Sequence, residues 1–85
     1  MNEEIEYQLK EEIALGDRAS RAWELYLKQY VEELNKQYYD EFINTNDIDI
    51  VVLIKNKQHA LMEMAQAIQS TIETGRLAQQ QIDEI

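Results

Sequence analysis

Residues 48–85 read IDIVVLIKNKQHALMEMAQAIQSTIETGRLAQQQIDEI, and this stretch decides the fold. It contains no proline and a single glycine, and its apolar residues recur every three or four positions. Such spacing is typical of one face of a long amphipathic helix that packs against a neighbouring helix. The repeat runs through Val51, Ile54, Leu61, Ala65, Ile68, Ile72 and Ile82, with Gln58, Gly75 and Gln79 at the intervening steps.

The N-terminal half of the chain carries the same helical repeat. Asn2 is placed to cap a helix that begins at Glu3, and acidic residues in the first turn suit the positive end of the helix dipole. Gly16 falls within the repeat without changing its phase, so we expect one continuous or gently bent helix over about residues 3–43, with a break into two helices at Gly16 as the alternative. The repeat consists of Ile5, Leu9, Ile13, Gly16, Ser20, Trp23, Leu27, Tyr30 and Leu34.

Residues 44–47, Asn-Thr-Asn-Asp, form the turn-like cluster of the chain. Their side chains bond to nearby backbone and compete with helix, so they end one helix and cap the next. We expect Asn46 to be the N-cap of a second helix over residues 48–84. A loop this short makes the two helices antiparallel neighbours, and residues 1–85 are therefore predicted to form one all-α helical hairpin.

Facing residues of an antiparallel hairpin follow a fixed register, and pairing Gly16 with Gly75 also pairs Trp23 with Ile68. Two facing glycines indicate a close approach of the helices, because neither has a Cβ atom. The alternative is a chance match with a local break at each glycine. We predict that the helix–helix seam consists of Leu9, Gly16, Trp23, Leu27, Tyr30, Leu34, Ile54, Leu61, Ala65, Ile68, Ile72, Gly75 and Ile82.

The chain has more apolar residues than one seam can bury. Contiguous exposed apolar surface marks an interaction site, so we expect the hairpin to associate into a helical bundle. A homodimer with four helices is the simplest form; a partner protein, or the N-terminal arm folded back at Gly16, would also cover the surplus. The candidate interface residues are Tyr26, Tyr39, Val52, Leu53, Met62 and Met64.

The charge of the chain limits its partners. Its net charge is −9, from 17 acidic and 8 basic residues, so nucleic acid and anionic membranes should repel it. The longest apolar run, residues 50–54, is far too short to cross a bilayer, and the acidic N-terminus does not resemble a secretory signal. The absence of cysteine fits a reducing compartment. We therefore expect a soluble cytoplasmic protein that binds neither nucleic acid nor membrane directly.

His59 is the one residue that raises the question of a metal site. Glu63 lies one turn beyond it, and Glu32 or Glu33 should approach it across the hairpin. A histidine and two carboxylates can hold one metal ion, whereas the simpler interpretation is a surface histidine beside an acidic neighbour. The sequence contains neither a glycine-rich phosphate loop nor a nucleophile with a matching base. We therefore predict no metal, no cofactor and no catalytic residue, and hence a protein without enzymatic activity.

Acidic residues crowd the first part of the chain and support one further hypothesis. Carboxylates along a rigid helix can imitate a nucleic-acid backbone and block a protein that binds it. The simpler interpretation is a solvated helix face that keeps a small protein soluble, and the interspersed lysines and arginines favour it. The residues concerned are Glu3, Glu4, Glu6, Glu11, Glu12, Asp17 and Glu24.

Two short segments, Gly16-Asp17-Arg18-Ala19 and residues 72–78 (Ile-Glu-Thr-Gly-Arg-Leu-Ala), flank an aromatic-rich middle. In this the chain resembles small acidic helical proteins encoded by tailed bacteriophages. The resemblance implies a phage origin and a place in head morphogenesis, in the host cytoplasm or on the virion, and it implies no activity. The leading hypothesis is an assembly-accessory or structural protein that acts by protein contact. The alternatives are a small acidic inhibitor of a host nucleic-acid-binding enzyme and a helical-hairpin chaperone of the secretion type.

Overall fold

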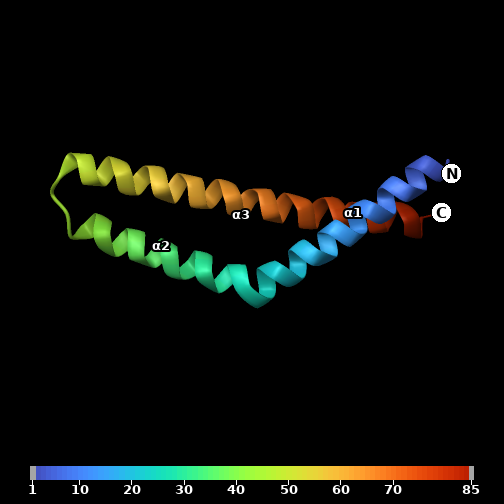
Figure 1. Cartoon of the computed structure of the whole chain (residues 1–85), viewed down its shortest axis with the longest axis horizontal. Helices are drawn as coiled ribbons and strands as arrows, with labels where there is room; N and C mark the ends of the chain where they lie inside the picture. Colours follow the sequence, from blue (N-terminus) through green and yellow to red (C-terminus); the bar gives the residue numbers. More distant parts are fainter. Residues whose placement is uncertain (1, 85) are drawn as a thin grey trace.

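A computed structural model describes residues 2–84, which form a long helical hairpin (Figure 1). The elements within these residues are α1 (Glu3–Ala22), a π-helical turn η1 (Trp23–Leu27), α2 (Lys28–Ile43) and α3 (Ile48–Asp83). The first three follow one another without interruption and form the first arm, and α3 forms the second. Both chain ends lie at one end of the rod and residues 44–47 at the other. The predicted all-α antiparallel hairpin is confirmed.

Polar side chains begin both arms. Asn2 caps α1 as predicted, since its Oδ1 accepts a hydrogen bond from the backbone N–H of Glu4 at 2.9 Å. The prediction that Asn46 caps α3 was wrong. Asp47 has the extended backbone of an N-cap (φ −86°, ψ 119°), and its Oδ1 accepts from the N–H of Asp49 at 2.9 Å. The side chain that caps is therefore the one directly before the first helical residue.

The first arm bends at η1 and not at Gly16. α1 continues through Gly16, so the favoured continuous helix is confirmed at that residue and the alternative of a break there is not. The backbone N–H of Lys28 donates to the carbonyl of Trp23, five residues earlier, which is the bond of a π turn. Such a wide turn is one of the recognised causes of a bent helix. The bend between α1 and α2 is visible in Figure 1.

The wide turn also changes which residues face α3. The predicted seam residue Tyr30 is 57% exposed, whereas its neighbour Val31 is only 5% exposed. An unbroken α-helix advances 100° per residue, and the π turn adds a residue to one turn, so the next residue takes the inward position. The core cluster consists of Val31, Leu61 and Ala65, with Trp23, Leu34 and Tyr38 packed against it.

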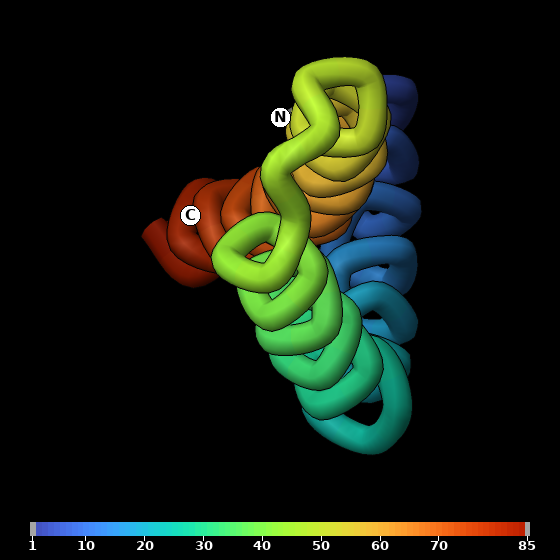
Figure 2. Tube along the Cα trace, turned by 90° about the vertical axis from the view of Figure 1, so that its left-hand side faces the viewer, coloured from blue at the N-terminus to red at the C-terminus, as the bar shows by residue number. Residues whose placement is uncertain are grey.

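Gly16 and Gly75 mark the place where α1 crosses α3. A Cβ atom built on Gly75 would lie 2.9 Å from the carbonyl oxygen of Glu12 and 2.9 Å from the Cα of Gly16. The two backbones therefore touch, and the predicted close approach is confirmed. Neither glycine has a positive φ, so it is the space between the helices that requires glycine here. Figures 1 and 2 show that the arms cross and do not run parallel.

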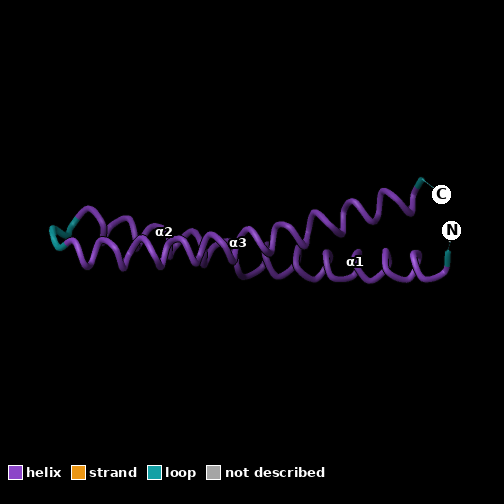
Figure 3. The backbone as a smooth tube through the Cα atoms, turned by 90° about the horizontal axis from the view of Figure 1, so that it is seen from above, coloured by secondary structure: helices purple, strands orange, loops and turns teal. Residues whose placement is uncertain are grey.

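The oblique crossing changes the register along the rod. Asn35 donates from Nδ2 to the Sδ of Met62 at 3.7 Å, whereas the register of the glycines would place Asn35 beside Asn56. Ala78, which the prediction omitted, is only 2% exposed. In the view from above, α2 lies over α3 while α1 and the end of α3 diverge (Figure 3). The other predicted seam residues are buried or half-buried: Leu9, Trp23, Leu27, Leu34, Ile54, Leu61, Ala65, Ile68, Ile72 and Ile82.

Candidate interaction surface

The hairpin leaves an unusually large part of its surface open. It exposes 6744 Å², whereas a compact protein of 10.1 kDa would expose about 5,300 Å². Its radius of gyration is 18.1 Å and it measures 59 × 22 × 15 Å, against a radius of about 12 Å for a globular chain of this length. None of the larger side chains of the described residues is fully buried. An open apolar surface of this kind is where a partner is expected to bind.

The residues that directly follow those of the buried row are almost all charged or polar. One residue further along a helix turns the side chain by 100°, so these positions share one side of each arm. We call this side the charged flank. On the first arm it consists of Asp17, Arg21, Glu24, Lys28 and Glu32. On α3 it consists of Lys55, His59, Gln66, Gln69, Glu73 and Arg76, with Met62 as its apolar member.

Over residues 15–30 and 53–67 the residues that directly precede those of the buried row are, by contrast, almost all apolar, whereas Glu12 and Glu33 hold the same position just beyond the row of the first arm. We call this side the apolar flank. On the first arm it consists of Leu15, Ala19, Ala22, Tyr26 and Tyr30. On α3 it consists of Leu53, Ala60, Met64 and Ala67, with Lys57 as the charged exception. Tyr30 therefore belongs to this flank, beside Val31, and not to the seam in which it was predicted.

A groove at the crossing shows that the apolar rows of both arms lie on the same side of the hairpin. Leu15, the first member of the row on the first arm, lines this groove together with four polar residues, Glu12, Ser70, Thr71 and Thr74. Thr71 and Thr74 continue the row of α3 four and seven residues beyond Ala67. The groove has a volume of about 220 Å³. The apolar flank is therefore one surface that extends across both arms.

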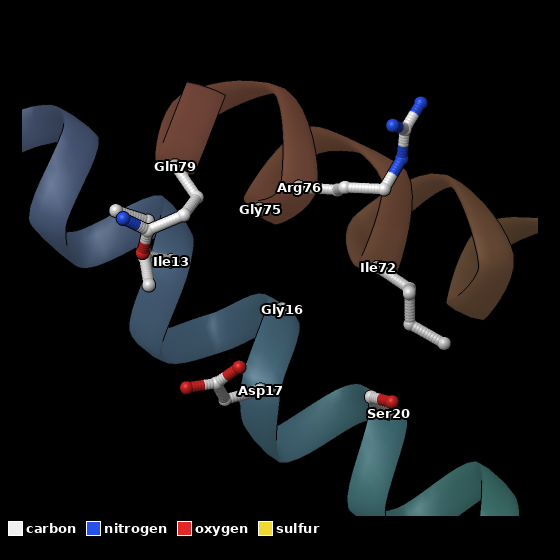
Figure 4. Close-up of a pocket in the computed structure, with 8 residues that line it drawn as sticks. All are labelled: Ile13, Gly16, Asp17, Ser20, Ile72, Gly75, Arg76 and Gln79. Carbon is white, nitrogen blue, oxygen red and sulfur yellow. The ribbon is translucent and has the colours of Figure 1, made fainter. Parts of the chain in front are cut away.

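The opposite side of the crossing has a groove of about 290 Å³ with Gly16 and Gly75 at its base and both apolar and polar side chains in its lining (Figure 4). Asp17 extends from α1 and Arg76 from α3 along its walls. Arg76 donates from Nε to Oε2 of Glu73 at 3.0 Å, and this hydrogen bond lowers the pKa of the Glu73 carboxyl. This groove is thus bordered by the charged flank. It lies on the other side of the crossing from the groove that Leu15 lines.

Three of the six predicted interface residues lie together. Tyr26, Leu53 and Met64 are exposed members of the apolar flank. Each lies directly before a buried or half-buried residue of the seam. This part of the predicted interface is a single surface.

The other three predicted interface residues lie elsewhere. Met62 lines a groove of about 310 Å³ with Lys55, Gln58 and His59, on the charged flank. Tyr39 follows Asn35 by one turn, and the Asn35 side chain contacts Met62, so Tyr39 lies on that side as well. Val52 precedes His59 by two turns and shares its exposed side of α3. The structure therefore does not bring the six residues into one interface.

The predicted interface did not include five residues of the apolar flank, because only large surplus side chains were considered. Leu15 and four alanines complete the surface. A signal was present in the sequence as adjacent apolar pairs, such as Ala60-Leu61 and Met64-Ala65, which make the apolar stripe two residues wide. The alanines concerned are Ala19, Ala22, Ala60 and Ala67.

The residues considered for a metal site do not converge. Nε2 of His59 lies 3.1 Å from Oε1 of Glu63, and both side chains are exposed. Within residues 2–84, no group of three or more histidine, cysteine, aspartate or glutamate side chains is placed to hold a metal ion, so Glu32 and Glu33 do not complete one. Among the same residues, no helix is long and apolar enough to cross a bilayer.

Comparisons with protein families, with curated proteins and with solved structures find no match for this chain. The functional assignment therefore depends on the two flanks and the grooves.

Proposed function

We propose that this chain is a non-enzymatic protein that acts by binding other proteins, as an assembly-accessory or structural component of a bacteriophage. The observation that carries the proposal is the open apolar surface: large side chains such as Leu25, Tyr26 and Leu53 are more than half exposed, on a chain whose total exposed area of 6744 Å² is well above the value for a compact protein of its size. The phage context comes from the resemblance of the segments at Gly16 and Gly75 to those of small phage proteins. Its place of action would be the host cytoplasm or the virion.

The shape of the molecule supports a role in assembly. The rod is 59 Å long, and an apolar row occupies about 20 Å of each arm, over residues 15–30 and 53–67, with the charged flank on the other side. Such a rod offers a long and shallow surface to another helical protein, and helix-in-groove packing uses side chains at this spacing.

Co-purification from cells that express the chain with its neighbouring genes tests the proposal. We expect an affinity-tagged chain to retain capsid or portal proteins, and to retain them in high salt, because apolar contacts do not weaken with ionic strength as exposed ion pairs do. The proposal would be contradicted if all bound protein were lost on raising the salt. Catalysis of a chemical reaction by the purified chain would contradict it as well.

The acidic residues exposed along α1 favour a second candidate function, inhibition of a host enzyme that binds nucleic acid. The carboxylates of Glu3, Glu4, Glu6 and Glu11 are exposed on α1, and Asp17 and Glu24 continue them. A row of carboxylates on a rod can occupy a basic nucleic-acid site. In the same purification this candidate predicts a polymerase or nuclease that dissociates as salt is raised, since its contacts are ionic. The identity of the retained protein and the direction of the salt effect separate the two functions.

A further inference from the structure

We propose that the apolar flank is the face through which two copies of this chain associate, forming a two-fold symmetric bundle of four arms. This inference deepens the proposed function, protein contact through an open apolar surface, by naming the face and its occupant. The face extends from Leu15 to Tyr30 on the first arm and from Leu53 to Ala67 on α3. A two-fold interface uses the same patch on both copies, so the patch must suit itself.

The area that needs covering has the size of a dimer interface. The chain exposes 6744 Å², about 1,400 Å² more than a compact protein of its mass. A typical stable interface removes about 800 Å² from each partner. One additional copy would therefore cover an area equal to more than half of the excess.

The distribution of charge lets two such acidic chains meet on this face, because the carboxylates on it, Glu12 and Glu33, lie at the ends of the apolar row of the first arm. Each copy carries a net charge of −9, so the copies repel one another unless their carboxylates are kept apart. Between residues 15 and 30 and between 53 and 67, Lys57 is the one charged residue in the apolar flank. Asp17, Glu24 and Glu32 lie on the opposite flank. Association through the apolar flank directs both charged flanks to solvent.

The side chains of the flank are large and small in similar numbers. Tyr26 and Met64 project from this flank. At Ala22, Ala60 and Ala67 the side chain is a single methyl group, so a partner can approach the helix backbone closely. Helices pack closely when large side chains of one enter spaces above small residues of the other. A single face that supplies both the projections and the spaces is complementary to a second copy of itself.

Two methionines provide a matched pair of variants. Met64 lies on the apolar flank and is 43% exposed, and Met62, two residues earlier on the charged flank, is 41% exposed. Met64→Glu and Met62→Glu change the net charge equally, in the same helix and at the same exposure. Sedimentation equilibrium should show a dimer for the unaltered chain and for Met62→Glu, and association weakened at least about tenfold for Met64→Glu, because a carboxylate would be buried against apolar side chains.

Circular dichroism of each variant shows whether its helices remain. If folding and association are coupled, Met64→Glu loses helicity along with its dimer, and the thermal midpoint of the unaltered chain rises with protein concentration. A Met64→Glu variant that unfolds while the midpoint of the unaltered chain is independent of concentration overturns the proposal. So does a monomeric unaltered chain at tens of micromolar, or equal weakening by both variants.

The outcomes also separate this inference from the proposed function. A folded monomer that still retains capsid or portal proteins refutes self-association and leaves the proposed function standing. A dimer that is lost only in Met64→Glu, but that retains none of those proteins, supports the inference and removes the proposed function.

Discussion

A single methyl group placed on Gly75 tests whether the crossing of the two arms holds the hairpin together. The Cβ atom of Gly75→Ala would lie 2.9 Å from the carbonyl oxygen of Glu12 and 2.9 Å from the Cα of Gly16. Ordinary carbon contacts are about 3.5–4.0 Å, so the helices must separate by about 0.6 Å or more. Both obstructing atoms belong to backbone and cannot rotate away. The new methyl group is therefore accommodated only by moving one helix.

The size of the effect follows from two opposing contributions. Alanine favours helix over glycine by about 1 kcal/mol. Overpacking costs about 1–3 kcal/mol, and a gap of the required size forfeits about a quarter to a half of the dispersion energy of the neighbouring contacts. Since rigid backbone places the cost in the upper part of this range, we expect Gly75→Ala to lower the free energy of unfolding by about 1–2 kcal/mol.

Thermal and urea unfolding followed by circular dichroism, at one fixed protein concentration, measures the change. Each 1 kcal/mol corresponds to about 4–8 °C in the midpoint for a domain of this size. Gly16→Ala should act in the same direction, because its Cβ would lie 2.9 Å from the Cα of Gly75. Ser70→Ala, at an exposed position of the same helix, is the control and should leave the midpoint unchanged or slightly higher. A raised midpoint in both glycine variants would refute the close crossing.

Three further substitutions examine the core and the cap. Val31→Ala should lower the unfolding free energy by about 2 kcal/mol. In the dissociated chain Tyr30→Ala should change the unfolding free energy by less than about 0.5 kcal/mol. A larger loss for Tyr30→Ala than for Val31→Ala would place the π turn elsewhere. Asp47→Ala should cost about 1 kcal/mol in urea unfolding and Asn46→Ala almost nothing; equal losses would argue against Asp47 as the cap. Trp23→Ala removes a half-buried side chain and should cost about 2 kcal/mol, and dissociation with stability unchanged would move Trp23 to the partner surface.

The helices and their antiparallel arrangement follow from local features of the sequence. The three- and four-residue spacing of apolar residues, the lack of proline and the cap at Asn2 act within a few residues of one another, so no tertiary information is needed to place them. The facing of Gly16 and Gly75 also followed from the sequence, because a short turn leaves two helices only one way to pair. The prediction located both arms and their crossing to within a residue or two.

Which residues are buried by contact between the arms could be determined only from the tertiary structure. Tyr30 and Val31 are adjacent and both apolar, so the repeat fits either phase, and only the π turn at Trp23–Leu27 makes Val31 the buried one. Ala78 and Gln79 both fit the spacing between Gly75 and Ile82, and only the structure shows that Ala78 is the buried one.

The candidate interaction surface depends partly on the sequence alone and partly on the tertiary structure. The sequence alone shows an apolar stripe two residues wide on each arm, through pairs such as Ala60-Leu61 and Ala67-Ile68. Which member of each pair meets the other arm, and which remains open, is decided by the orientation of one helix about its axis relative to its neighbour. That rotation depends on the contact of Gly16 with Gly75 and on the wide turn at η1, because both act across the hairpin or through it.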